Sequence, residues 1–280
     1  MAKHRYAMDE NKIARFVKEG RGQGQGKDYK PWLTIADVAS VGRHSRPYSP
    51  KTQRHHELLS DIENGVFHLY NWSDEVTDIR EQFPLDRVVT QRIAKDMGIR
   101  HPTDSKTGCE IVMTTDFLIS VTQEGRSFEL ARSVKHAEAF DRRTLDKQEI
   151  ERRYWQAQGT DWGIITSHQL PEPFVTNVRW AHEFISLQYL DELYVGYWND
   201  RCNRLTEYLE QRSGINIQTM IRELEQLHGF AHGHVINVIR HFIATKRLCM
   251  DMHQEWSVNR DISTLYFPEQ RRSQRHAVGE

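Results

Sequence analysis

The stretch Met113-Thr114-Thr115-Asp116-Phe117-Leu118-Ile119 lies inside a longer segment, 111–121, in which apolar residues recur at every second position. This period of two predicts a β-strand whose odd-numbered side chains, from Ile111 to Val121, share one buried face. A second strand is predicted over 128–136, and Gly125 between the two predicts an antiparallel hairpin. Asp116 has the opposite parity, so it is expected to point away from the apolar face.

The segments around this hairpin predict an α/β core. A helix is expected over 55–70, with an apolar stripe formed by Leu59, Ile62, Val66 and Tyr70. Glu57, Ser60, Asp61, Asn64 and His68 are expected on the solvent side of this helix, with Glu63 on the shoulder of the stripe. Further elements are predicted in the order strand 76–85, the hairpin, helix 144–158 and strand 162–166.

Residues 1–54 are expected to be mostly irregular, with one short helix over 10–19. The following segment, Gly20 to Lys27, has glycine at every second position, which opposes both helix and strand. It could be a pliable cationic loop, with Arg21 and Lys27 contacting DNA phosphate, or a flexible connector. The sequence leaves both interpretations open.

The charge of the chain is uneven although the formal net charge is only −1. Residues 1–54 hold 12 Lys and Arg against 5 Asp and Glu, whereas residues 55–170 hold 14 against 20. This excludes a uniformly basic, histone-like protein and suggests a polyanion partner for the basic part and cation binding for the acidic part. No apolar run approaches the roughly 20 residues that span a bilayer, so no membrane association is expected.

The three cysteines are distant from one another and odd in number, so no disulfide framework is predicted. The chain also begins without the apolar stretch of a secretory leader. Both features favour a cytoplasmic protein.

Residues 171–267 are predicted to form a separate α-rich domain after a linker at 170–173. One helix is expected around Leu193, Tyr197, Leu205 and Leu209, a second after Asn216, and a third from His234. Two short strands, 248–252 and 264–267, would complete a winged helix. Residues 268–280, rich in arginine, are expected to be a disordered tail.

A candidate catalytic site follows from the hairpin. Strand periodicity places Ser133 and Lys135 on one face, and hairpin pairing brings Asp116 beside them. With Glu63 from the preceding helix, two carboxylates and one ammonium would surround a point, a set suited to Mg²⁺-assisted phosphodiester hydrolysis. The alternative is an Asp116–Lys135 cross-strand ion pair, with Glu63 paired to Arg54.

At these residues the chain resembles the TnsA family, the endonuclease subunit of heteromeric cut-and-paste transposases. The resemblance spans about residues 12–166. It is carried by Lys18-Glu19-Gly20-Arg21-Gly22-Gln23-Gly24, Gly26-Lys27-Asp28-Tyr29, Pro31-Trp32-Leu33-Thr34, Leu59-Ser60-Asp61, Asp78-Ile79-Arg80-Glu81-Gln82-Phe83-Pro84-Leu85, Thr115-Asp116-Phe117-Leu118, Val134-Lys135 and Glu151-Arg152-Arg153-Tyr154-Trp155.

The resemblance implies a restriction-endonuclease-like fold for residues 1–170, with Glu63, Asp116 and Lys135 as the catalytic set. One or two Mg²⁺ ions, which Mn²⁺ could replace, would be held by Glu63, Asp116 and the backbone carbonyl of Val134. Ser133 stands where the family has Gln or Glu, so that metal position departs from the family pattern. Glu151 matches an acidic family position and is expected to be an exposed helix residue, paired with Arg153 or Lys147.

The resemblance also implies a role and partners. The family cuts the 5′ ends of a transposon, while a TnsB-type transposase acts on the 3′ ends and a TnsC-type AAA+ ATPase contacts both. The substrate would be double-stranded DNA at transposon ends, at the nucleoid of a bacterium. Ser133 leaves a catalytically silent adaptor open as an alternative. A stand-alone restriction or repair nuclease and a winged-helix transcription factor are further alternatives.

Three smaller predictions concern other polar residues. Arg240 and Lys246 could face a DNA groove or a protein partner. His55 and His56 could contact DNA phosphate or simply begin an exposed helix. A zinc site is conceivable, although a polar turn is favoured, at His228, His232, His234, Cys249 and His253.

Overall fold

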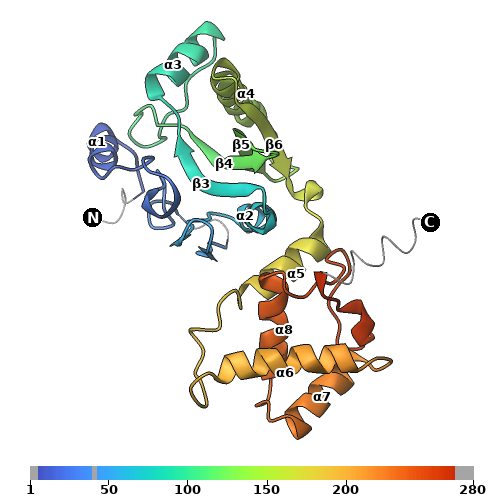
Figure 1. Ribbon diagram of the computed structural model, residues 1–280. Coiled ribbons are helices and arrows are strands. Elements are labelled where there is room, and N and C mark those ends of the chain that lie inside the picture. The colour runs from blue at the N-terminus through green and yellow to red at the C-terminus, as the bar shows by residue number, and fades with distance from the viewer. Residues whose placement is uncertain (1–5, 40–42, 269–280) are drawn as a thin grey trace, which may run out of the picture. The chain divides into compact units, whose positions relative to one another are not determined.

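The structure is a computed structural model that describes residues 6–39 and 43–268. The chain divides between Leu170 and Pro171 into two compact units (Figure 1). The predicted disordered tail, from residue 269 onward, lies outside the described residues. No helix in the described part of the chain is long and apolar enough to cross a bilayer.

A four-stranded sheet of order β3-β4-β5-β6 forms the centre of the N-terminal unit. Its strands are β3 (Val76–Pro84), β4 (Thr114–Gln123), β5 (Arg126–Lys135) and β6 (Asp161–Thr166). The predicted hairpin is confirmed, because β4 and β5 pair antiparallel through a two-residue turn. Glu124 and Gly125 in this turn both have positive φ, of 50° and 77°, as the hairpin turn that matches strand twist requires. β6 then adds parallel to β5.

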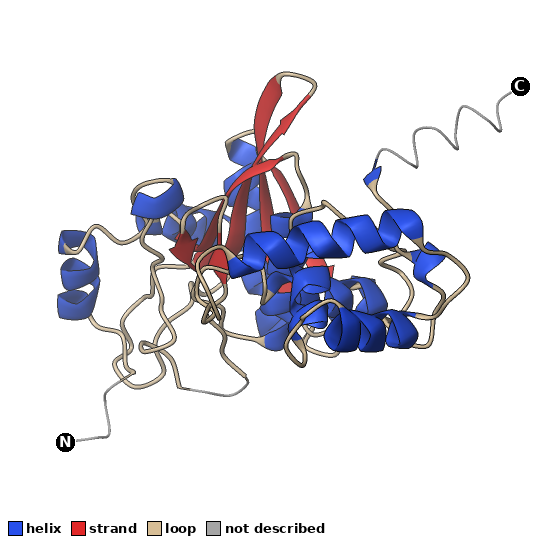
Figure 2. Ribbon diagram, turned by 60° about the horizontal axis from the view of Figure 1, so that its bottom comes forward, coloured by secondary structure: helices blue, strands red, loops and turns tan. Residues whose placement is uncertain are grey.

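Helices cover both faces of this sheet (Figures 1 and 2). α2 (Asp61–Trp72) packs Val66 and Phe67 against Phe117 and Ile119 of β4. On the other face, α3 (Arg87–Asp96) and α4 (Arg142–Ala157) form a second core against β4 and β5. The result is the predicted α/β architecture, a sheet between two helical layers.

α2 departs from its prediction at its start and on its polar face. The helix begins at Asp61, not at residue 55, because the Ser60 side chain caps the backbone N–H of Glu63. Asn64 and His68, expected in solvent, are buried. The prediction assumed one covered face, but the preceding segment also covers α2: the Ser49 hydroxyl donates to Asn71, and the His56 ring lies 4.7 Å from Phe67.

The segment before α2 is ordered by short elements. It contains α1 (Glu10–Lys18), where a helix was predicted, a 3₁₀ turn, η1 (Gly26–Asp28), and the two-residue strands β1 (Tyr48–Ser49) and β2 (Arg54–His55). Tyr29 and Trp32 are buried. The backbone N–H of Gly26 donates to Asp78 of β3 at 3.2 Å, and that of Trp32 donates to the carbonyl of Gln82, so the glycine-rich segment and the residues after it are joined to the central sheet.

The C-terminal unit is helical. It follows η2 (Ser167–Gln169) and contains α5 (Glu172–His182), α6 (Tyr197–Gln211), α7 (Ile217–Leu227), α8 (His234–Ala244) and η3 (Ile262–Thr264). α5 was missed because Pro171 and Pro173 suggested a linker, yet proline is tolerated in a first helical turn, where the missing N–H needs no partner.

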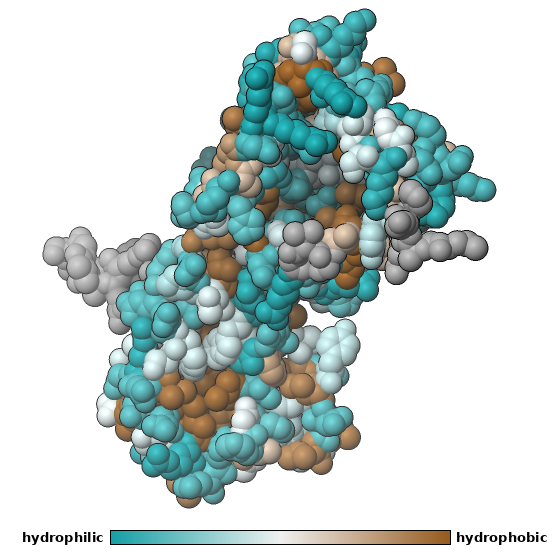
Figure 3. Space-filling view, turned by 180° about the vertical axis from the view of Figure 1, so that it is seen from behind, coloured by the Kyte–Doolittle hydropathy of each residue, from teal (hydrophilic) through white to brown (hydrophobic). Residues whose placement is uncertain are grey.

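The two predicted C-terminal strands do not form. Within the described residues the pairing of 248–252 with 264–267 reduces to one bridge between Cys249 and Tyr266. Met250 and Met252 are buried, so the apolar pattern reflects packing of an irregular segment rather than a ribbon. Figure 3 shows apolar surface gathered on this unit, where Tyr189, Leu193 and Val195 are exposed.

Candidate active site

Glu63 lies in the first turn of α2 and is 7% exposed. Its Oε1 accepts a hydrogen bond from the Ser60 hydroxyl at 2.9 Å, and its Oε2 accepts one from the Leu59 N–H at 3.0 Å. Together with the bond from the Glu63 N–H to the Ser60 hydroxyl, they fix the carboxylate at the helix N-terminus. Burial, followed by the negative charge of Asp116, raises the pKa of Glu63 to about 7. The predicted pair between Glu63 and Arg54 is wrong, since Arg54 pairs with Glu81.

At Asp116 the alternation of side chains between the two faces of β4 is interrupted. Phe117 and Ile119 face α2, but Thr115, predicted on the same face, donates to Glu151 of α4. Gln82, the β3 residue between the pairs Glu81–Phe117 and Phe83–Thr115, has a φ of 48°, a left-handed conformation that is unusual for a non-glycine residue. The side chains therefore change faces at Asp116, and the odd-numbered residues do not share one face.

The Asp116 carboxylate is tied to β5 through its Oδ2 atom. Oδ2 accepts from the backbone N–H of Val134 at 2.6 Å, from Lys135 Nζ at 2.9 Å and, more weakly, from the Ser133 hydroxyl at 3.4 Å. Lys135 Nζ also donates to the Val134 carbonyl at 2.9 Å. Burial disfavours the charged ammonium, but the ion pair with Asp116 outweighs it and raises the pKa of Lys135. Lys135 is therefore a cation in this state, not a lysine with a lowered pKa.

Glu151 is an additional member of the site. The prediction of an exposed helix carboxylate is wrong: Glu151 is 2% exposed, and Glu149 instead pairs with Arg152 and Arg153. Glu151 Oε1 accepts from the Thr115 hydroxyl at 2.8 Å and from the Trp162 indole at 3.1 Å. Burial, and then the charge of Asp116, raises its pKa to about 7. Its position one turn before Trp155, on the inner face of α4, was the signal in the sequence.

Ser133 joins the two acidic sides of the site. Its hydroxyl lies 3.1 Å from Glu151 Oε2 and 3.4 Å from Asp116 Oδ2, and the residue is 1% exposed. Serine, which is shorter than the Gln or Glu of the family pattern, thus contacts carboxylates from both β4 and α4 at this position.

The donor chemistry of this site fits a hard divalent cation. Glu63, Asp116 and Glu151 place three carboxylates around one ammonium, and burial, followed by the charge of Asp116, raises the pKa of both Glu63 and Glu151. Gln148 Oε1 is also buried without a hydrogen-bond partner among the described residues. No set of three His, Cys, Asp or Glu side chains is preassembled as an ion cage in the described part. Mg²⁺, however, commonly uses one or two carboxylates and keeps its waters.

The predicted DNA-contacting residues differ in their surroundings. Arg21 bonds Asp37 at 2.6 Å and stacks 3.5 Å over Phe16, so its guanidinium fastens the glycine-rich segment. Lys27 is exposed. Arg240 donates to the Trp180 carbonyl and pairs with Glu183, which keeps it within the C-terminal unit. Lys246 follows α8 with a φ of 57°.

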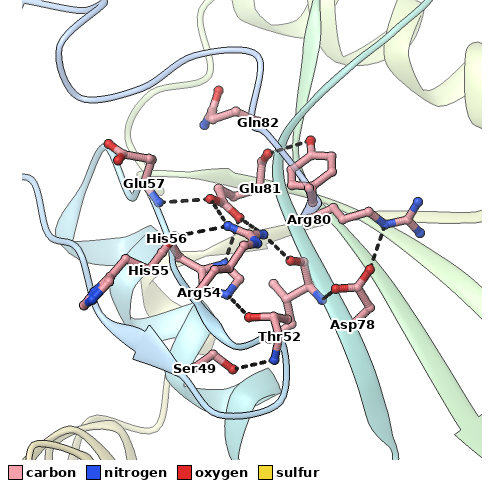
Figure 4. A network of polar contacts seen from close by, with 12 residues as sticks. Ser49, Thr52, Arg54, His55, His56, Glu57, Asp78, Arg80, Glu81 and Gln82 are labelled. Carbon is pink, nitrogen blue, oxygen red and sulfur yellow. Dashed lines mark hydrogen bonds and ion pairs between the residues drawn. The ribbon is translucent and has the colours of Figure 1, made fainter. Parts of the chain in front are cut away.

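His56 is not available to DNA because it belongs to a buried network (Figure 4). Its ring nitrogens bond Thr52 and Glu81 at 2.8 Å each, and it is fully buried. His55 is exposed and contacts the Arg46 carbonyl. In the C-terminal unit His234 bonds Tyr197 and His232 bonds Glu225. No zinc cluster forms among the described residues there.

Comparison with known proteins shows the family of this chain. Residues 73–167 match the family model described as TnsA-like endonuclease N terminal, and residues 169–252 match the one described as TnsA endonuclease C terminal. The chain is 38% identical over 261 residues to the transposon Tn7 transposition protein TnsA of Escherichia coli, covering 93% of each chain. The first model includes Asp116, Ser133, Lys135 and Glu151. The chain therefore belongs to the TnsA family of transposon endonucleases.

Proposed function

We propose that this endonuclease hydrolyses phosphodiester bonds with Mg²⁺, for which Mn²⁺ can substitute, at the site formed by Glu63, Asp116 and Lys135. The supporting observation is that these three side chains, distant in sequence, interact in one buried place. Asp116 pairs with Lys135 at 2.9 Å, and the charges of both act on the pKa of Glu63. A salt bridge with no catalytic role does not explain why two further acids are buried beside it.

Each side chain has a distinct role in this proposal. Glu63 and Asp116 hold the metal, with the Val134 carbonyl as a further ligand; Ser133 can contribute at most a neutral hydroxyl. The bound ion would make the attacking water more acidic and offset charge on the phosphate. Lys135, charged in this environment, donates to a phosphate oxygen and stabilises the negative charge that develops during attack. Glu151 orients Ser133 and Thr115, and its charge favours cation binding.

We further propose that the N-terminal unit is a restriction-endonuclease-like nuclease. It would cut the 5′ ends of a transposon in double-stranded DNA, in the bacterial cytoplasm. The relative from Escherichia coli is a transposition protein, which supports action together with a TnsB-type transposase and a TnsC-type ATPase. A winged-helix role for residues 171–267 is not part of the proposal, because the ribbon is missing.

The test is donor excision with the partner proteins present, comparing the wild type with Asp116→Ala. Loss of 5′ cleavage with 3′ cleavage retained is the expected result. Retained 5′ cleavage in the variant would refute the assignment of the site. No 5′ cleavage by the wild type would favour the silent adaptor instead. Arg153→Gln, on the exposed side of α4, is the matched control and should cut normally.

A further inference from the structure

The face of α4 that carries Glu151 also carries two cations. Arg143, Lys147 and Glu151 are spaced by four residues, so they lie on one helical face with about 6 Å of rise between neighbours. Glu151 contacts Ser133 inside the candidate active site, so the row begins there and extends outward through Lys147 to Arg143. The pKa of Lys147 is lowered by burial and then by the positive charges of Arg143 and Lys135, in agreement with this placement.

The two cations of this row, Arg143 and Lys147, line a cavity of about 480 Å³. One wall consists of Arg143, Asp146, Lys147 and Ile150 of α4, and the other consists of the segment after α3, including Arg100 and Asp104. Three cationic side chains from two distant parts of the sequence therefore surround one opening beside the site. Arg100 and Arg143 are exposed and Lys147 is half-buried; like charges held close together favour the binding of an anion between them.

The three cations are not held in direct ion pairs, although the charge of Asp141, at the start of α4, acts on Lys147 and Arg143. Among the described residues, no carboxylate forms an ion pair with Arg100, Arg143 or Lys147. Elsewhere on α4 the arginines are paired, since Arg152 and Arg153 share Glu149.

The two carboxylates of the cavity wall offset only part of this charge. Asp104 accepts from the backbone N–H groups of Met8, Lys106 and Thr107, so its oxygens are engaged away from the three cations. The lining holds Arg100, Arg143 and Lys147 against Asp104 and Asp146, so it keeps an excess of one positive charge.

We propose that Arg100, Arg143 and Lys147 bind consecutive backbone phosphates of duplex DNA on one side of the scissile bond. The inference rests on the proposed position of the catalytic site. From Glu151 to Arg143 the helix rises about 12 Å, which is more than one small anion spans but suits a phosphate chain. Contacts of this kind position DNA without reading its sequence.

The experiment measures binding of the full-length protein to a fluorescent duplex of arbitrary sequence, in EDTA, across a range of salt concentrations. Each lost phosphate contact lowers the slope of log K against log salt by about 0.9. The double variant Arg143→Gln/Lys147→Gln should therefore bind more weakly at low salt, with a slope shallower by about 1.8. Arg153→Gln is the control; it removes one charge from the same helix and should keep the wild-type slope.

Parallel slopes for the wild type and the double variant would overturn the proposal, as would the absence of binding by the wild type at low salt. If the double variant loses excision in the complete transposase but keeps its DNA slope, the cations contact a protein partner and the proposal is likewise overturned. Asp116→Ala separates this inference from the proposed function. Its DNA slope should equal that of the wild type, whether or not it cuts.

Discussion

The guanidinium of Arg54 forms a two-pronged ion pair with the carboxylate of Glu81, at 2.7 and 2.6 Å, inside the N-terminal unit (Figure 4). Glu81 is completely buried and also accepts from His56 and from the Glu57 N–H. Arg54 donates further to the carbonyls of Gly26 and Ile79. The pair therefore joins the glycine-rich segment, β2 and β3, directly before Gln82 and the candidate site.

Breaking only one side of this pair should be strongly destabilising. Glu81→Gln leaves the Arg54 guanidinium buried without a counter-charge, and we expect a loss of about 3–5 kcal/mol in the free energy of unfolding. The double variant Arg54→Met/Glu81→Leu removes both charges and should recover part of that loss, because the His56 ring and the Glu57 N–H still lose their acceptor. Denaturant unfolding of the three proteins measures this. Equal destabilisation by the single and double variants would show that packing, not charge, explains the effect.

The same network predicts sensitivity to acid. Burial opposes ionisation of Glu81, but His56 and Arg54 outweigh it and lower its pKa to about 2. Because the unfolded state binds a proton more readily, the stabilisation is complete above about pH 4.5 and is lost as the pH falls toward 2. Burial also lowers the pKa of His56, so its protonation below about pH 6.5 acts in the same direction.

Thermal unfolding between pH 7 and pH 3 checks this, with Glu81→Gln as the reference. The wild type should lose stability more steeply than the variant below about pH 4.5. If the stability of the wild type and that of Glu81→Gln fall in parallel as the pH is lowered, Glu81 does not cause the loss of stability in acid.

Metal binding should release protons near neutral pH. Without metal, Glu63 and Glu151 each have a pKa of about 7, so both are partly protonated at pH 7. A cation favours the ionised carboxylates, so affinity should rise as the pH rises toward about 7 and level off above it. Calorimetric titration with Mg²⁺ or Mn²⁺, in buffers of different ionisation enthalpy, counts the released protons. Glu63→Gln should lower both affinity and release, whereas unchanged release would place the cation elsewhere.

Local patterns were enough to predict the hairpin and the meeting of Asp116 with Lys135, because strand periodicity and the turn at Gly125 fix that register. They could not place Glu151. The spacing of four residues from Trp155 indicates a shared helical face, but how far that face is buried depends on how α4 packs across the sheet. α3 was missed for a related reason, since its apolar positions are few and Val88 is exposed. The Arg54–Glu81 pair joins segments 27 residues apart, so it too follows from tertiary structure.

Two substitutions at position 133, to glutamine and to leucine, introduce side chains of similar size but different chemistry. Ser133 is buried between Asp116 and Glu151, and the TnsA resemblance places Gln or Glu there. Ser133→Gln adds a carbonyl oxygen that can reach a cation, so 5′ cleavage in the complete transposase should be kept or increased. Ser133→Leu adds similar volume without an oxygen and removes the hydrogen bond to Glu151, so cleavage should fall at least tenfold, a barrier change of about 1.4 kcal/mol. Both variants should show similar melting temperatures if volume alone governs folding. An equal loss of cleavage in both would mean that position 133 only needs to be small, and that it has no part in holding a metal.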